Sequence, residues 1–226
     1  MSANPAPAKP SASVVVVRDG ARSLEVLLVR RNEKIAFHGG AWVFPGGRVD
    51  DSDGAGRASS ELDLAKRAAV REALEETGLE LTVDAMLPFA HWTTPVDLPK
   101  RFATWFFAAV IDGVADVRID NSEIVDYRWM TPAAALGLHV AGKLNLPAPT
   151  FVTLLGFKST DSCARLVERL RGVEIQRFVP RLVPIDDGRC TLYEEDAGYE
   201  TSDFHVPGAK HRLVMKGTDW EYIRDF

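Results

Sequence analysis

The fold of this chain is decided by two stretches, Phe44-Pro45-Gly46-Gly47-Arg48-Val49 and Arg71-Glu72-Ala73-Leu74-Glu75-Glu76-Thr77-Gly78-Leu79. The first ends a short apolar run with a turn-forming Pro-Gly-Gly sequence. The second has the composition of a helix, and Gly78 is suited to the position that follows a helix end. Ser60 and Asp63 have capping-box spacing, so we expect the helix to begin near Ser60. The sequence therefore predicts a strand, a loop, and a helix that ends at Gly78.

Three carboxylates gather on one side of this predicted helix. At about 100° per residue, Glu72, Glu75 and Glu76 lie within roughly one quadrant. They repel one another at the helix C-terminus, where the macrodipole is also negative. Arg71 lies beside Glu75 and can hold one carboxylate by a bidentate pair. Either this face is simply solvated, or a cation neutralises it, and Mg²⁺ or Mn²⁺ is the natural candidate because hard cations take oxygen ligands.

The same residues resemble the Nudix box, the signature of the Nudix hydrolases. Residues 71–79 match its pattern Arg-Glu-apolar-x-Glu-Glu-x-Gly-apolar, and Gly47 resembles the glycine that precedes it. The resemblance implies a metal-dependent hydrolase with Mg²⁺ (or Mn²⁺) as cofactor, in which Arg71 belongs to the catalytic set with the glutamates. The implied metal ligands are Gly46, through its carbonyl, and Glu72, Glu75 and Glu76. The implied fold is α/β (α+β), an α/β/α sandwich with a mixed sheet and a C-terminal extension of helical and extended segments.

The chain departs from the family pattern in the loop before the helix. The stretch between Gly47 and Arg71 is about ten residues longer than in the family, and a loop tolerates such an insertion at small entropic cost. We place the extra residues in the loop 50–60. Counted back from Arg71, the first glutamate of the family pattern falls at Asp63, whose shorter side chain changes or removes its role.

Other segments resemble the branch of the family that contains the mammalian peroxisomal coenzyme A diphosphatases. The segments are Arg30-Arg31-Asn32 to Asp50, Trp92-Thr93-Thr94-Pro95, Arg101 to Phe107, and Pro147-Ala148-Pro149-Thr150. The resemblance implies that the partner is a small-molecule diphosphate, with coenzyme A or acyl-CoA as one substrate. ADP-ribose, dinucleotides and nucleotide sugars carry the same diphosphate and stay open as alternatives. A non-catalytic Nudix-fold binding module is a further alternative.

Several side chains near the box are candidates for binding substrate. Arg30, Arg31 and Arg48 are suited to phosphate contacts, although surface arginines are usually just solvated. Trp92 is suited to stacking on a base, although aromatic residues on a strand are often core. The general base stays open among four acidic residues, namely Glu75, Glu76, Asp120 and Glu123.

Composition narrows the class of protein. The chain has 226 residues, of which 46% are hydrophobic and 26% charged, as expected for a globular protein. The net charge of −5 disfavours a nucleic-acid partner. Apolar runs are too short to span a membrane, so no membrane partner is expected. Two cysteines, Cys163 and Cys190, indicate no disulfide framework, and the cytoplasm is the expected location.

The pattern of the whole chain predicts three parts: a disordered leader over residues 1–11, a Nudix domain over 12–143, and an extension over 144–226 packed on the same domain. Further strands are predicted over residues 14–17, 24–30, 41–44, 79–89, 102–111 and 124–130. Helices are predicted after Thr131 and over residues 147–157 and 161–170, and extended segments over 173–185 and 212–215. The extension either covers the substrate site or forms a homodimer interface, and the sequence does not choose.

Overall fold

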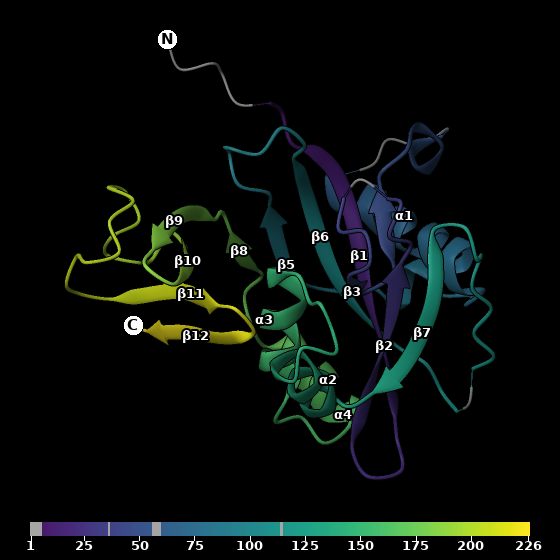
Figure 1. Ribbon diagram of the computed structural model, residues 1–226. Helices are drawn as coiled ribbons and strands as arrows, with labels where there is room; N and C mark the ends of the chain where they lie inside the picture. The colour runs from purple at the N-terminus through teal and green to yellow at the C-terminus, as the bar shows by residue number, and fades with distance from the viewer. Residues whose placement is uncertain (1–5, 36, 56–59, 114) are drawn as a thin grey trace.

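An eight-stranded mixed sheet forms the centre of the molecule in the computed structural model, which describes residues 6–35, 37–55, 60–113 and 115–226 (Figure 1). Its strands follow the order β3-β2-β1-β6-β5-β8, with β4 paired to β1 and β7 to β2. The β1–β6 and β5–β8 pairs are parallel and the others antiparallel. The strands are β1 (Lys9–Asp19), β2 (Leu24–Arg31), β3 (Trp42–Val43), β4 (Gly46–Arg48), β5 (Leu87–Thr93), β6 (Phe102–Val110), β7 (Ile124–Met130) and β8 (Gln176–Phe178).

Helices cover both faces of this sheet. In β1, Val14 and Val16 pack with the alanines of one helix, whereas Val15 and Val17 pack on the opposite face against the other helices. A strand buried on both faces reads as a continuous apolar run, as residues 14–17 do. The helices are α1 (Glu61–Thr77), α2 (Pro132–Val140), α3 (Ala148–Phe157) and α4 (Cys163–Arg171), with short 3₁₀ turns η1 (Asp51–Gly54) and η2 (Val83–Ala85). The predicted α/β/α sandwich with a mixed sheet is confirmed.

Helix α1 begins and ends where the sequence predicts. Ser60 is its N-cap and accepts from the backbone N–H of Asp63, whose carboxylate accepts in return from the N–H of Ser60. Gly78 follows the helix in the left-handed conformation, with φ of 70°. These two caps fix where α1 begins and ends, and therefore fix that the acidic turn is the last turn of the helix.

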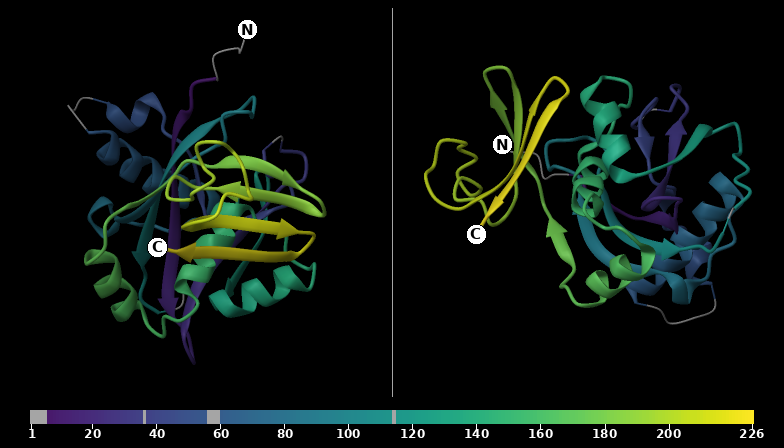
Figure 2. Two further views of the ribbon diagram at one scale, coloured as in Figure 1. Left: turned by 90° about the vertical axis from the view of Figure 1, so that its left-hand side faces the viewer. Right: turned by 90° about the horizontal axis from the view of Figure 1, so that it is seen from below.

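A second, four-stranded antiparallel sheet is formed by the last part of the chain. Its order is β12-β11-β10-β9, and it stands to one side of the main sheet, next to α3 and β8 (Figures 1 and 2). Trp92 of β5 stacks on Phe178 with ring centroids 3.8 Å apart, and Tyr193 meets Trp92 edge-on. These rings connect the two sheets. The strands are β9 (Arg181–Ile185), β10 (Gly188–Leu192), β11 (Lys210–Lys216) and β12 (Asp219–Asp225).

Some predicted elements differ from the structure. Strand β1 begins at Lys9, within the expected leader, of which residues 1–5 lie outside the described part. The strand predicted over 79–89 is wrong for most of its length, because η2 occupies 83–85 and pairing with β6 begins only at Leu87. Strands β4, β10 and β12 were not predicted. Within the described ranges, no helix is both long and apolar enough to cross a membrane.

We expect Gly78→Ala to destabilise the protein, since an alanine in the left-handed conformation costs about 1–2 kcal/mol. The added carbon would also lie 3.3 Å from the Cβ atom of Arg118. Gly137→Ala is the matched control, because Gly137 lies exposed inside α2 with no atom within 4 Å of the added carbon. That change should stabilise the protein by about 0.5–1 kcal/mol. Urea unfolding measures both, and equal effects would contradict the assignment of Gly78 as the helix end.

Candidate active site

A cavity of about 880 Å³ lies where the main sheet, α1 and the second sheet meet. Most of the predicted site residues line it, together with Glu123 and residues 145–150. The exceptions are Arg30, which lies outside the lining, and Glu76, which is buried behind it. The predicted residues in the lining are Arg31, Gly46, Arg48, Arg71, Glu72, Glu75 and Trp92.

The two glycines of the turn allow very close packing around the acidic residues. Strand β4 pairs with β1 so that Gly46 lies opposite Ser13, and a side-chain carbon on Gly46 would lie 2.7 Å from the Cα atom of Ser13. A carbon on Gly47 would collide with the carboxylate of Glu72. The backbone contact requires glycine at position 46 for β4 to approach β1, whereas a side chain at position 47 would have to displace the Glu72 carboxylate.

Arg71 connects the acidic residues of α1 to the preceding segments. Its Nε and Nη2 atoms each donate to the Asp53 carboxylate at 3.1 Å, and Nη2 also donates to the carbonyl of Arg48 at 2.9 Å. Its Nη1 atom donates to Glu72 at 2.8 Å and to Glu75 at 3.2 Å. One guanidinium thus offsets the repulsion within α1 and fixes η1 and β4 against it.

Glu76 is the most deeply buried of the three glutamates, with 5% of its surface exposed. Its carboxylate accepts from the backbone N–H of Gly46 at 2.9 Å, and Arg31 lies 3.9 Å away. Burial raises the pKa of Glu76 to about 8, because the hydrogen bond from Gly46 and the charge of Arg31 offset only part of the desolvation. An ionised Glu76 therefore needs more positive charge than the protein supplies.

The donor set suits a hard divalent cation. Burial raises the pKa of Glu72, Arg71 partly opposes this, and the charges of Glu75 and Glu123 add to the rise. Among the described residues, no three His, Cys, Asp or Glu side chains stand in positions that would hold a metal ion. Carboxylate oxygens beside an open cavity, short of compensating charge, nevertheless fit Mg²⁺ or Mn²⁺ in chemical type.

The predicted substrate-binding residues have different surroundings. Arg31 lies between Glu76 and Glu123, 3.8 Å from the latter, and Arg48 is exposed in the lining. Arg30 instead pairs with Glu33 at 2.6 Å, and the β2–β7 ladder shifts register between Arg30 and Arg31. Arg30 lies outside the cavity lining, so its predicted contact with substrate stays a prediction that the cavity does not support. Trp92 is buried with one ring face stacked on Phe178, which leaves that face unable to stack on a base.

Outside α1, the carboxylate that accepts hydrogen bonds from Arg71 is that of Asp53, not that of Asp63, the residue at the position of the family's first glutamate. Asp53 is buried in η1, whereas Asp63 belongs to the capping box of α1. Counting six residues forward from Gly47, before the insertion, would have found Asp53. Asp120, a candidate base, lies outside the cavity lining and accepts from three backbone N–H groups of the following turn. Of the two loop acids considered as candidate bases, Glu123 is the one that lines the cavity.

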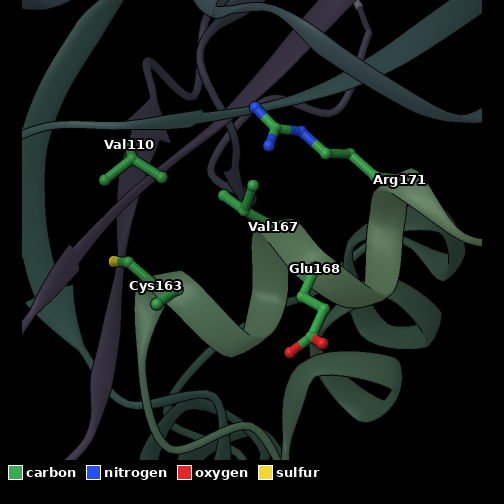
Figure 3. Close-up of a pocket in the computed structure, with 6 residues that line it drawn as sticks. Val110, Cys163, Val167, Glu168 and Arg171 are labelled. Atoms are coloured by element: carbon green, nitrogen blue, oxygen red, sulfur yellow. The ribbon is translucent and has the colours of Figure 1, made fainter.

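A second hollow, of about 580 Å³, lies beside α4 (Figure 3). Figure 3 shows Cys163 and Val167 facing Val110, while the carboxylate of Glu168 points away from them. Burial, with a contribution from the charge of Asp19, raises the pKa of Cys163 to about 12, so the thiol is not an activated nucleophile. None of the predicted site residues lines this hollow.

Comparison with known sequences establishes the family. The NUDIX domain matches residues 7–152, which include both the Gly46-Gly47 turn and the acidic turn of α1. The chain therefore belongs to the Nudix family.

Individual relatives are distant. The acyl-coenzyme A diphosphatase NUDT19 of Xenopus laevis is 22% identical over 295 aligned positions, covering 88% of this chain and 77% of that protein. A Caenorhabditis elegans protein named as a nudix hydrolase is 26% identical over 178 residues, which make up 62% of this chain and 59% of its own length. The crystal structure of a NUDIX hydrolase from Alicyclobacillus acidocaldarius has a TM-score of 0.65 and 22% identity, covering 75% of this chain and 98% of that one. The similarity to the Alicyclobacillus acidocaldarius structure supports the fold.

We expect Asp53→Asn to lower the free energy of unfolding at pH 7 by about 1–3 kcal/mol, because Arg71 loses its charged partner. Asp51→Asn is the matched control, since Asp51 lies exposed in the same 3₁₀ turn, and it should change stability by less than about 0.5 kcal/mol. Urea unfolding compares the two variants. Equal stability of wild type and Asp53→Asn would show that Asp53 does not hold Arg71.

The loss of stability caused by Asp53→Asn should depend on pH. Burial on its own would raise the pKa of Asp53, but hydrogen bonds and charge from Arg71 outweigh it, and the net pKa lies below the ordinary value of 3.8. A lowered pKa in the folded state adds stability above the ordinary value, and this stability is lost as the pH falls through the folded pKa. The difference between wild type and Asp53→Asn should therefore be full at pH 7 and shrink below pH 3.8.

Proposed function

We propose that this protein is a divalent-metal-dependent hydrolase that cleaves the phosphoanhydride bond of a nucleoside diphosphate linked to another moiety. The observation that carries the proposal is the acidic turn of α1. Glu72 and Glu75 line the large cavity, Glu76 is buried directly behind the Gly46 turn, and Arg71 holds the turn together. Membership of the Nudix family supports the same chemistry.

The residues that would hold the Mg²⁺ or Mn²⁺ are Glu72, Glu75, Glu76 and the carbonyl of Gly46. When bound, such a cation neutralises diphosphate charge and lowers the pKa of a water molecule for attack on phosphorus. Arg31 and Arg48 lie in the same lining and are suited to hold diphosphate oxygens. Of the four candidate bases, Glu123, beside Arg31, and Glu75 are exposed in the lining and suited to accept a proton from water.

Coenzyme A and acyl-CoA are the substrates that we propose first. The relative NUDT19 is named as an acyl-coenzyme A diphosphatase, and the segments around Trp92 and Pro147 that resemble that branch line the cavity here. A cavity of this size accommodates a nucleotide with part of its second moiety. ADP-ribose, dinucleotides and nucleotide sugars are the alternative substrates.

Residues 144–226 are proposed to work as an extension of the same domain. Side chains of α3 and of the second sheet share a hydrophobic cluster with the main sheet, and several of them line the cavity. This favours a cover over the substrate site. A homodimer interface stays a separate prediction, which light scattering of the purified protein would test.

We expect the wild type to hydrolyse at least one diphosphate when Mg²⁺ or Mn²⁺ is added, and to lose this activity with EDTA. The panel contains coenzyme A, an acyl-CoA, ADP-ribose, a dinucleoside polyphosphate and a nucleotide sugar, with products separated by chromatography. The preferred substrate decides between the coenzyme A branch and the alternatives. Tight binding of a panel member without any turnover would instead support a non-catalytic binding module.

Glu76→Gln should lower kcat by about 100-fold or more, because the neutral amide cannot take the place of the carboxylate. The melting temperature should stay equal or rise, since the variant removes a buried group whose ionised form is disfavoured in the fold. Glu80→Gln is the control, because Glu80 is exposed just after α1, and it should keep full activity. Full turnover by Glu76→Gln would overturn the proposed metal site.

A further inference from the structure

Part of the cavity lining comes from beyond the region that matches the NUDIX domain. That region ends at residue 152, whereas the second sheet begins at Arg181. The second sheet nevertheless contributes side chains from each of its four strands to the cavity. They are Leu182, Arg189, Thr191, Met215 and Trp220.

The register of the second sheet places these residues on one face. Arg189 of β10 lies opposite Met215 of β11, which in turn lies opposite Trp220 of β12, and residues directly opposite point to the same side. Thr191 follows two positions later and shares that side. The intervening Cys190 belongs to a separate hydrophobic cluster on the other face. The sheet therefore has one face for its own small core and one face for the cavity.

Arg189 is the one cation among the five side chains that the second sheet contributes to the cavity lining. Its side chain is exposed, and across the described ranges that side chain makes neither a hydrogen bond nor an ion pair. Arg71 by contrast is fully engaged by its acidic neighbours, and Arg31 lies between two glutamates. A positive side chain without a protein partner, in the lining of a cavity, is available to an anionic ligand.

A second observation relates Arg189 to the predicted phosphate contacts. Partial desolvation lowers the pKa of His38, which also lines the cavity, and the positive charges of Arg31 and Arg189 lower it further. Both guanidinium groups thus act on one imidazole ring. Leu182, Met215 and Trp220 add apolar surface to the same part of the lining, and a reduced local dielectric strengthens an ionic contact.

We propose that Arg189 binds a second phosphate group of the substrate, a phosphate monoester on the nucleoside separate from the diphosphate that is cleaved. The second sheet would then set substrate specificity, while the acidic turn of α1 performs the chemistry. This inference rests on the proposed function for its biological meaning, but its test does not require turnover.

Calorimetry measures the binding of adenosine 3′,5′-bisphosphate and adenosine 5′-monophosphate to the full-length protein without added metal. Wild type should bind the bisphosphate about tenfold or more tightly than the monophosphate, as expected for a charge-assisted hydrogen bond. Arg189→Gln should reduce this ratio to about one or two. Arg22→Gln is the matched control, because Arg22 is exposed in the turn between β1 and β2 and lies outside the cavity lining, and it should keep the wild-type ratio.

Three results would overturn the inference: no preference for the bisphosphate in wild type, a preference that survives Arg189→Gln, or no binding of either nucleotide. A kinetic comparison separates this failure from failure of the proposed function. If a diphosphate with the extra phosphate is a substrate, Arg189→Gln should raise its KM about tenfold with little change in kcat. Absence of metal-dependent turnover would contradict the proposed hydrolase function, and the calorimetric result would still decide the role of Arg189.

Discussion

The hydrogen bonds of Arg71 are the constraint on which the acidic site depends. Carboxylates on one turn of a helix repel one another, and the C-terminal position of that turn adds an unfavourable dipole. Arg71 contacts Glu72 and Glu75 on its own helix, the buried Asp53 in η1 and the carbonyl of Arg48 in β4. A single guanidinium thus fixes three segments together. With β4 in place, the backbone N–H of Gly46 donates to the carboxylate of Glu76.

Features with local causes were the ones that could be predicted from the sequence. The ends of α1 depend on Ser60 and Gly78, which act within one turn, and the acidic face follows from helical geometry alone. Asp53 could not be assigned by counting back from Arg71, because the path of the inserted loop decides which acid arrives there. Residues 79–85 have apolar alternation typical of a strand, but the structure places η2 there, and no described strand pairs with this segment.

The strands of the second sheet could not all be predicted from the sequence, because their arrangement depends on contacts between residues that are distant in the chain. Strands β10 and β12 carry many polar residues, so their pattern does not distinguish them from loops. A buried ion pair ties β11 to the segment after β10: both carboxylate oxygens of Asp196 accept from Arg212 at 2.7 Å, and the N–H of His211 also donates to Asp196. Such a pair requires good geometry to offset its desolvation, and therefore favours one arrangement of the chain. The position of Arg189 follows from that arrangement and from no local motif.

Glu76 shows why the candidate site lowers the stability of the folded protein. Folding raises the pKa of Glu76 from its ordinary value of 4.5 to about 8. At pH 7 the carboxylate is therefore ionised in the unfolded chain but disfavoured as an anion in the folded one, so it opposes folding. A neutral side chain of similar shape would pack there with less cost, and the hydrogen bond from Gly46 does not remove the difference. Local rules of this kind are broken mainly where function requires it. A cation bound as we propose would favour the ionised carboxylate that the isolated fold disfavours, and would thereby offset this cost.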